Sequence, residues 1–285
     1  MKSNIWKKSL AVSLLATLSL TAMSGCGAAS TESAEGQSRL DQILAEGKIT
    51  MVTSPDFAPL EFEDISSGQT EYVGSDIELA KYIAEKLGVE LEIEAMDFSA
   101  VQAAITTGKA DIAIAGFAAT PERQESMELS IPFNKENDDG QGLLVKADQA
   151  ANYTTAESFS GKKVGAQNGS LQFNLVSSQL PDANVELVSS LNDGVLMLQT
   201  GKIDALAVSG DNGLMMADNY DDVVMCDFYF EYESEGNVVA MTKGETELAE
   251  AVNEILEEVN EKGLYEEWRK EAVELADSLG VEVNE

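Results

Sequence analysis

The chain has 285 residues, with 51 acidic and 18 basic side chains and no histidine, and its formal net charge is −33. The absence of histidine excludes a Ser-His-Asp hydrolase, a histidine-based metal site and proton transfer by histidine. The negative charge disfavours binding to nucleic acid or to an anionic membrane surface, because both repel such a protein. We therefore expect no nucleic acid partner, no metal and no other cofactor.

The first 25 residues are typical of a secretory signal peptide. Three lysines precede an apolar run over residues 10–22, which is too short to span a bilayer, and small residues then lead to Cys26 in T-A-M-S-G-C-G. This stretch resembles a lipobox, although Met23 stands where Leu is preferred. We expect a lipidated Cys26 that anchors an extracytoplasmic protein to the cell membrane. The alternative is a plain secretory signal with an incidental cysteine.

Residues 26–38 are small and polar, which is typical of a flexible tether. If Cys26 is lipidated, Cys226 is the only other cysteine, so an intramolecular disulfide is impossible. A buried structural role for Cys226 is favoured, because a Cys-His nucleophile is excluded. The rest of the chain is long enough for two lobes of ordinary size.

Two parts of the chain repeat each other. T-G-K-A-D at 107–111 and T-G-K-I-D at 200–204 each follow an apolar helical pattern and precede a short apolar run. The expected strands are 48–53, 89–95, 111–115, 163–166, 184–188 and 205–208, and the expected helices between them include 75–87 and 170–180. This alternation predicts an α/β fold with two lobes, each a mixed, mostly parallel sheet flanked by helices.

Polar, turn-rich segments at 131–140 and 232–236 indicate that the chain crosses between the lobes twice. We expect lobe 1 to comprise residues 39–138 and 236–285, and lobe 2 to comprise residues 139–235. The return segment is predicted to form a strand at 237–241 and a helical region over 245–279 that Gly263 interrupts. A cleft between two such lobes is a favoured position for a small-molecule site.

The segment G-F-A-A-T-P-E-R at 116–123 directly follows a predicted strand. Thr120 is predicted to cap a helix that begins at Pro121, which brings a hydroxyl, free backbone N–H groups and the guanidinium of Arg123 to the carboxyl end of the strand. A carboxylate is the natural partner of Arg123, because the planar guanidinium binds two oxygens at once. The alternative is an ordinary capped helix with a solvated arginine.

These segments give the chain a resemblance to the extracellular solute-binding proteins of polar amino acid ABC transporters. The likeness covers nearly the whole mature chain and rests on P-D-F-A-P-L-E-F (55–62), V-G-S-D-I-E-L-A-K-Y-I-A-E-K-L-G (73–88), G-K-A-D-I-A-I-A-G-F-A-A-T-P-E-R (108–123), G-K-K-V-G-A-Q-N-G-S (161–170) and G-L-Y-E-E-W (263–268). The resemblance implies a type II periplasmic-binding-protein-like fold. It also implies a monomer that closes on an amino acid and delivers it to permease subunits, without enzymatic activity.

The resemblance further implies which residues contact the ligand. An aromatic wall, a carboxylate-binding segment and a helix N-terminus of the second lobe would surround it. The expected contacts are Phe57, Phe98, Gly116, Ala118, Thr120, Arg123, Gln167, Gly169, Ser170, Ser209 and Asp211. The phenylalanines could instead belong to the core, and Gly169-Ser170 could be a plain helix cap. Glu61 is expected to be a structural hydrogen-bonding residue.

The partner of the ligand ammonium is the main departure from the family pattern. The usual acid falls on Ser209, and Ser54 stands where some members carry aspartate. Asp211 takes this role if the turn in S-G-D-N-G is re-formed, while Asp56 and the acidic loop 136–139 are weaker candidates. Otherwise the ligand cation is placed differently, or the ligand lacks a primary α-amine.

Two other functions are compatible with the same resemblance. The first is a surface protein that senses a solute without transporting it. The second is an enzyme similar to cyclohexadienyl dehydratases, which would need a cleft acid with a raised pKa.

Overall fold

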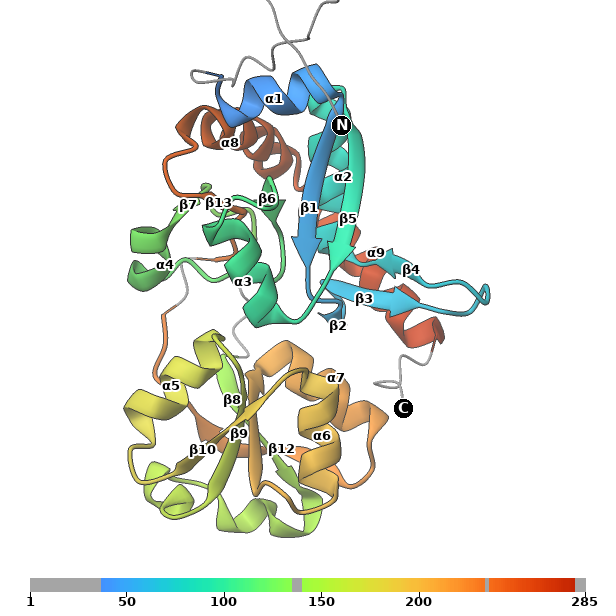
Figure 1. The fold of residues 1–285 in the computed structure, drawn as a ribbon. Helices are drawn as coiled ribbons and strands as arrows, with labels where there is room; N and C mark the ends of the chain where they lie inside the picture. Colours follow the sequence, from blue (N-terminus) through green and yellow to red (C-terminus); the bar gives the residue numbers. More distant parts are fainter. Residues whose placement is uncertain (1–36, 135–139, 234–235, 280–285) are drawn as a thin grey trace, which may run out of the picture. The chain divides into compact units, whose positions relative to one another are not determined.

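Two five-stranded sheets organise the part of the chain that the structure describes (Figure 1). The computed structural model describes residues 37–134, 140–233 and 236–279. The predicted signal peptide, Cys26, most of the tether and the acidic loop 136–139 lie outside the described residues. These described residues form one compact unit. Within the described ranges, no helix is both long enough and apolar enough to cross a membrane.

The first sheet has the strand order β5-β1-β6-β13-β7. Its strands are β5 (Glu90–Ala95), β1 (Lys48–Thr53), β6 (Ile112–Ala113), β13 (Ala240–Thr242) and β7 (Met127–Leu129). β1 pairs in parallel with β5 and β6, whereas β13 is antiparallel to β6 and to β7. Four strands therefore run in one direction, and β13 is the reversed strand. We use the name lobe 1 for this sheet together with the helices α1 (Arg39–Glu46), α2 (Ser75–Leu87), α3 (Phe98–Thr106), α4 (Pro121–Ser126), α8 (Thr246–Lys262) and α9 (Leu264–Leu279).

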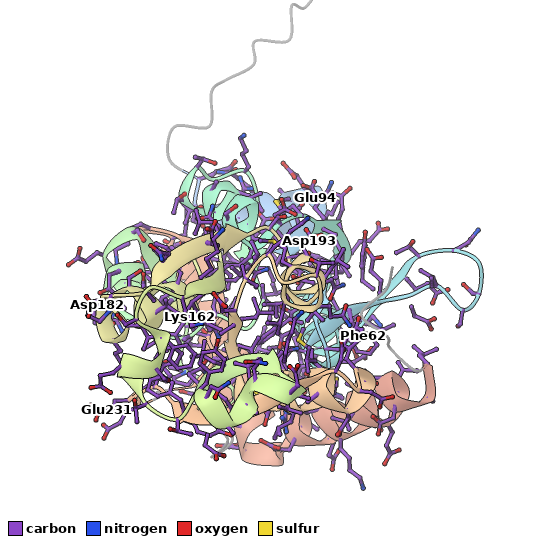
Figure 2. The ribbon with its side chains drawn as sticks, turned by 90° about the horizontal axis from the view of Figure 1, so that it is seen from below. Phe62, Glu94, Lys162, Asp182, Asp193 and Glu231 are labelled. Carbon is purple, nitrogen blue, oxygen red and sulfur yellow. The ribbon has the colours of Figure 1, made fainter. Side chains whose placement is uncertain are left out.

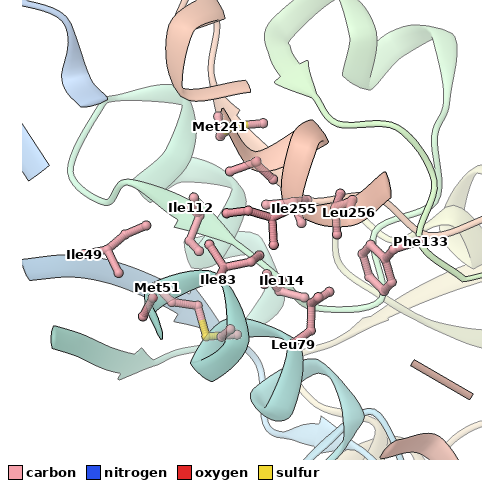
Figure 3. Close-up of a cluster of buried hydrophobic side chains, with 14 of the residues drawn as sticks. Ile49, Met51, Leu79, Ile83, Ile112, Ile114, Phe133, Met241, Ile255 and Leu256 are labelled. Atoms are coloured by element: carbon pink, nitrogen blue, oxygen red, sulfur yellow. The ribbon is translucent and has the colours of Figure 1, made fainter. Parts of the chain in front are cut away.

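Alternate residues of these strands face opposite sides of the first sheet, as the geometry of a strand requires. Met51 of β1 belongs to a buried cluster with Ile83 of α2 and Leu256 of α8 (Figure 3). The next residue, Val52, belongs to a second cluster with Val101 of α3. Each fully buried side chain of this size contributes roughly 1.5–3 kcal/mol, so both faces of the sheet stabilise lobe 1.

The second sheet has the strand order β10-β9-β11-β8-β12, and we call it lobe 2 together with its helices. Its strands are β10 (Asn184–Val188), β9 (Lys163–Gln167), β11 (Ala205–Ser209), β8 (Gln141–Lys146) and β12 (Val223–Tyr229). β8 is antiparallel to both neighbours, so four strands again share one direction. The helices are α5 (Leu171–Gln179), α6 (Leu191–Gln199), α7 (Gly210–Asn219) and the 3-10 helices Ala147–Asn152 and Ala156–Phe159.

Lobe 2 also buries both faces of its sheet. Leu143 packs with Leu175 of α5, whereas the neighbouring Leu144 packs with Val195 of α6. Acidic residues such as Asp182 and Glu231 lie exposed at the outside (Figure 2). The negative charge of the chain therefore lies largely in water, where it costs little.

A small antiparallel sheet, β2-β3-β4, lies outside the two main sheets. Its strands are β2 (Asp56–Phe57), β3 (Glu61–Asp64) and β4 (Glu71–Val73). Phe62 of β3 is buried against Ala272 and Ala276 of α9. The sequence patterns predicted neither this sheet nor α1, β7 or β12, but the contacts show that the small sheet joins residues 56–73 to the C-terminal helix.

The predicted α/β architecture with two mixed, mostly parallel sheets is confirmed. Helix α2 and strand β10 have the predicted bounds, and Gly263 separates α8 from α9 with a φ of 66°. The Thr120 hydroxyl accepts a hydrogen bond from the N–H of Arg123, and α4 begins at Pro121, as predicted. The predicted boundaries between the lobes fall next to residues outside the described ranges and stay predictions.

The structure corrects two local predictions. The strand expected at 237–241 is regular only over 240–242, because the N–H of Val239 donates to the hydroxyl of Ser130 and Asn237 makes only isolated bridges. The segment S-G-D-N-G, expected to be a turn, forms the start of α7 instead. Gly213 allows this helix to pack closely, since a Cβ there would lie 2.3 Å from the sulfur of Met225.

Gly74 provides a test of how the small sheet meets α2. Gly74 has a φ of 124°, and a Cβ on it would lie 2.1 Å from the carbonyl oxygen of Leu60. We expect Gly74→Ala to lower the free energy of unfolding by at least about 3 kcal/mol, through backbone strain and overpacking together. Gly88→Ala is the control, because Gly88 has a φ of 72° with no atom within 4 Å and should cost only about 1–2 kcal/mol. Urea unfolding measures both changes, and equal losses would contradict the prediction.

Candidate functional site

The carboxyl ends of strands from both lobes border one cavity. Ser54 follows β1, Gly116 follows β6, and Gln167 and Ser209 end β9 and β11, and all four line this cavity. The alternation of strand and helix explains the position, because the loops after parallel strands gather at the same edge of a sheet. The cavity therefore lies where the sequence predicted a ligand site.

Most of the residues that the resemblance selected are brought together around this cavity. The predicted residues that line it are Phe57, Phe98, Gly116, Ala118, Arg123, Gln167, Ser170, Ser209 and Asp211. Thr120 and Gly169 are not among the lining residues. Thr120 instead caps α4, and the carbonyl oxygen of Gly169 accepts hydrogen bonds from Arg123 (3.5 Å) and Gln102 (3.2 Å). Both therefore lie next to Arg123 and act on its position.

Arg123 is the most buried basic group of the cavity wall, with 7 % of its surface exposed. Its Nη1 donates to the carbonyl oxygen of Ala118 at 2.9 Å. Its guanidinium carbon lies 4.8 Å from the ring centre of Phe117 and 5.5 Å from that of Phe98. Such contacts orient the guanidinium and offset part of the cost of removing a cation from water.

The two predicted aromatic residues differ in their surroundings. Phe98 is buried in the core of lobe 1 against Phe117, and it also lines the cavity. Phe57 is half-buried and packs against the cluster of lobe 2 that contains Val208. Gly116 makes room for it, since a Cβ there would lie 2.9 Å from the Phe57 ring. Both readings of Phe98, core residue and cavity wall, therefore hold at once.

The Asp56 carboxylate connects the two lobes at the cavity. It belongs to β2 in the small sheet, and its Oδ2 accepts hydrogen bonds from Nε2 of Gln167 (3.0 Å) and from the N–H of Leu191 (2.8 Å), at the first residue of α6. Its Oδ1 accepts from the Ser54 hydroxyl at 2.9 Å. Burial raises the pKa of Asp56, while the N–H of Leu191 and the Ser54 hydroxyl oppose this shift.

Two further carboxyl groups, Glu61 and Asp76, are buried beneath the cavity. Glu61 lines the cavity and is 1 % exposed, and Asp76 accepts hydrogen bonds from the Tyr265 hydroxyl and from the N–H of Gly116 (3.1 Å). Burial, followed by the charge of Asp76, raises the pKa of Glu61 well above its ordinary value. Burial also raises the pKa of Asp76, although its hydrogen bonds with Tyr265 and Gly116 oppose the shift. Glu61 is thus part of the cavity wall, and because its Oε2 is buried without a hydrogen-bond partner among the described residues, its expected role as a structural hydrogen-bonding residue stays a prediction.

The expected ammonium site contains a residue that the sequence patterns missed. Ser209 occupies the N-cap position of α7 without a capping hydrogen bond from its side chain and lies half-buried, and Asp211 follows in the first turn of that helix. Oδ2 of Asp211 forms an ion pair with Nη2 of Arg269, which extends from α9 of lobe 1 and lines the same cavity. The side chains of Arg269 and Asp211 are only 17 % and 26 % exposed, so the pair is largely sheltered from water.

Uncharged polar residues complete the wall, and sequence patterns did not select them either. They are Asn134, Gln141, Gln172, Asn212 and Asn237. The Oδ1 atoms of Asn212 and Asn237 are buried without a hydrogen-bond partner among the described residues. The only local signal for Arg269 is its position four residues after Tyr265, which places both on one face of a helix. Among the described residues, no group of three His, Cys, Asp or Glu side chains is arranged to hold a metal ion.

Comparison with known proteins agrees with this geometry. Residues 49–273 match the model of the bacterial extracellular solute-binding proteins, family 3. The chain is 26 % identical to the arginine-binding extracellular protein ArtP of Bacillus subtilis, over 90 % of this chain and 94 % of that protein. It is 28 % identical to a glutamine-binding protein of Geobacillus stearothermophilus, over 75 % of this chain and 84 % of that protein. A crystal structure of the substrate-binding protein AbpA from Streptococcus pneumoniae, bound to L-arginine, has a TM-score of 0.78 at 33 % identity and covers 85 % of this chain and 99 % of its own.

The fold and the cavity therefore define a two-lobed binding protein of the type II periplasmic class. The chain belongs to the bacterial extracellular solute-binding proteins, family 3. This result confirms the family that the sequence motifs indicated.

Glu61 predicts how the stability of the protein changes with pH. Its pKa is about 4.3 in an unfolded chain, and burial raises it in the folded protein. Above pH 4.3 the unfolded state releases the proton before the folded state does, so the free energy of unfolding falls as the pH rises through the folded-state pKa. Glu61→Gln keeps the uncharged form and should flatten this decline above about pH 4.3, measured by urea unfolding at several pH values. The exposed Glu63→Gln is the control, and an unchanged slope in Glu61→Gln would contradict the prediction.

Proposed function

We propose that this chain is a lipid-anchored, extracytoplasmic receptor that captures an amino acid between its lobes and delivers it to the permease of an ABC transporter. The family and the amino acid-binding names of its relatives support this proposal. The proposed lobes are 39–138 with 236–285, and 139–235. The protein acts as a monomer and performs no chemical conversion of its ligand.

The position of Arg123 is the observation that carries the proposal. Its guanidinium lines the cavity, and the rings of Phe98 and Phe117 and the Ala118 carbonyl hold it in place. A fixed, sheltered guanidinium binds the two oxygens of a carboxylate in one orientation. The α-carboxylate of an amino acid therefore binds at Arg123, next to the backbone of Gly116 and Ala118.

Residues of both lobes close around the remainder of the ligand. Phe57 of the small sheet and Phe98 of lobe 1 provide the apolar wall, and Gln167, Gly169 and Ser170 approach from lobe 2. The ligand contacts both lobes only when the cavity is closed, so binding shifts the population toward the closed state. Thr120 supports the carboxylate site indirectly, because its hydroxyl caps the helix that carries Arg123.

The α-ammonium binds at the start of α7. Asp211 supplies a carboxylate there, and Asn212 adds a buried Oδ1 that lacks a partner among the described residues. A buried acceptor without a donor costs free energy, and the ammonium of the ligand removes that cost by donating to Oδ1 of Asn212. Asp56 is the weaker candidate because its carboxylate already accepts from Ser54, Gln167 and Leu191.

Ligand binding tests the role of Arg123. A thermal-shift screen of the twenty amino acids, their common derivatives and amine-free carboxylates identifies the ligand, since a micromolar binder at millimolar concentration stabilises by about 4 kcal/mol. Arg123→Gln should then weaken binding of that ligand at least tenfold in calorimetry, or about 1.4 kcal/mol. Arg39→Gln removes the same charge away from the cavity and should bind as the wild type does. Unchanged affinity in Arg123→Gln would remove Arg123 from the site, and no stabilisation by any compound would contradict the receptor function.

Cys26 tests the proposed anchor. The wild-type protein should partition into the detergent phase of a cloud-point extraction and incorporate a labelled fatty acid, because two or more acyl chains hold stably to a membrane. Cys26→Ser should remain in the aqueous phase and carry no label, while Cys226→Ser should behave as the wild type does. Partitioning of Cys26→Ser into detergent would contradict lipidation at this position.

A further inference from the structure

Arg269 gives the cavity a second guanidinium, one residue beyond the segment G-L-Y-E-E-W that contributed to the family resemblance. The chain contains three arginines, and two of them, Arg123 and Arg269, line this one cavity. Arg269 reaches it from α9, far from the other lining residues in sequence. Its partner there is Asp211, which belongs to α7 of the other lobe.

Among the described residues, the carboxyl groups that line the cavity are Asp56, Glu61 and Asp211, and none of them is reserved for a cationic side chain. Asp211 shares its charge with Arg269. Asp56 accepts hydrogen bonds from Ser54 and from two donors of lobe 2. Glu61 is buried beside Asp76, where the cost of ionisation raises its pKa. A ligand whose carboxylate binds Arg123 therefore meets carboxyl groups that already have donors, a cationic partner or a raised pKa, together with one additional cation, Arg269.

We propose that the Arg269–Asp211 pair makes this receptor select amino acids with uncharged or acidic side chains and reject those with cationic side chains. This inference rests on the proposed function and names the substrate class of that same site. A guanidinium or ammonium group on the ligand side chain would add a second cation to the α-ammonium, in a sheltered cavity where Asp211 already pairs with the guanidinium of Arg269. Like charges placed together in such a site are a common means of excluding the wrong partner.

Arg269 and Asp211 come from different lobes, so the discrimination depends on closure. In the closed state the pair is present and the cationic ligand is disfavoured. Separation of the lobes would break the pair and leave both charges in water. A cationic side chain would therefore disfavour the closed state, in which the Arg269 guanidinium is held at the cavity.

Calorimetry with the full chain in mild detergent tests the inference. The probes are L-arginine, L-lysine, L-glutamine, L-glutamate and the strongest ligand of the thermal-shift screen. The wild type should bind that strongest ligand, which should be uncharged or acidic, at least tenfold more tightly than L-arginine and L-lysine. Arg269→Gln should reduce this ratio at least tenfold, or about 1.4 kcal/mol, by strengthening the binding of the cationic amino acids.

Two further variants distinguish the loss of the positive charge at position 269 from a general effect of substitution on the fold. Arg269→Lys keeps the positive charge and should retain the discrimination, and Arg39→Gln should leave the ratio unchanged. L-arginine or L-lysine as the strongest ligand of the wild type would overturn the inference while the proposed function stood. An unchanged ratio in a folded Arg269→Gln protein would overturn it as well. Absence of binding by every amino acid would contradict the proposed function, and this inference with it.

Discussion

The hydrogen bonds of the Asp56 carboxylate are the interaction on which the geometry of the cavity depends. A buried carboxylate is costly unless donors surround it, and here donors of lobe 2 meet a carboxylate of the small sheet beside lobe 1. Asp56, Ala58 and Asn212 line the cavity and also a second hollow beside it, so this hydrogen-bonded wall separates the two spaces. The amide of Asn212 donates to the carbonyl oxygen of Ala58 at 3.0 Å and completes the wall.

The same arrangement explains how polar groups reach the cavity wall although both lobes have apolar cores. Strands bury alternate residues on their two faces, and only the loops after their carboxyl ends are available to face a ligand. Those loops bring backbone groups, caps and a few side chains, such as Gln167 and Ser170, to one place. Arg269 is the exception, because it reaches the cavity from the middle of a helix.

Local signals in the sequence predicted a large part of this structure. The bounds of α2, the cap at Thr120 and the break at Gly263 depend on neighbouring residues, and all three are confirmed. The start of α7 was wrongly predicted as a turn, because the glycines in S-G-D-N-G favour turns unless close packing requires them, as Met225 does at Gly213. Arg269 was missed because the residue that explains its position, Asp211, lies in another lobe. Arg269 could be identified as a cavity residue only from the tertiary fold, because no pattern within α9 indicates it.

The position of β13 has a consequence for the order in which the protein folds. Leu129 of β7 pairs with Ala240 of β13, about 110 residues later, and β13 is the only described strand beside β7. The sheet of lobe 2, by contrast, is contained within residues 141–229. Closing a long loop costs conformational entropy before the contacts of the loop ends form. Lobe 2 can therefore fold as an independent unit before the reversed strand β13 completes the sheet of lobe 1. The chain is synthesised from its N-terminus, so lobe 1 begins to form first but is completed last. Until β13 is made, the edge of the lobe 1 sheet stays unpaired and is the part of the nascent chain most exposed to misassembly.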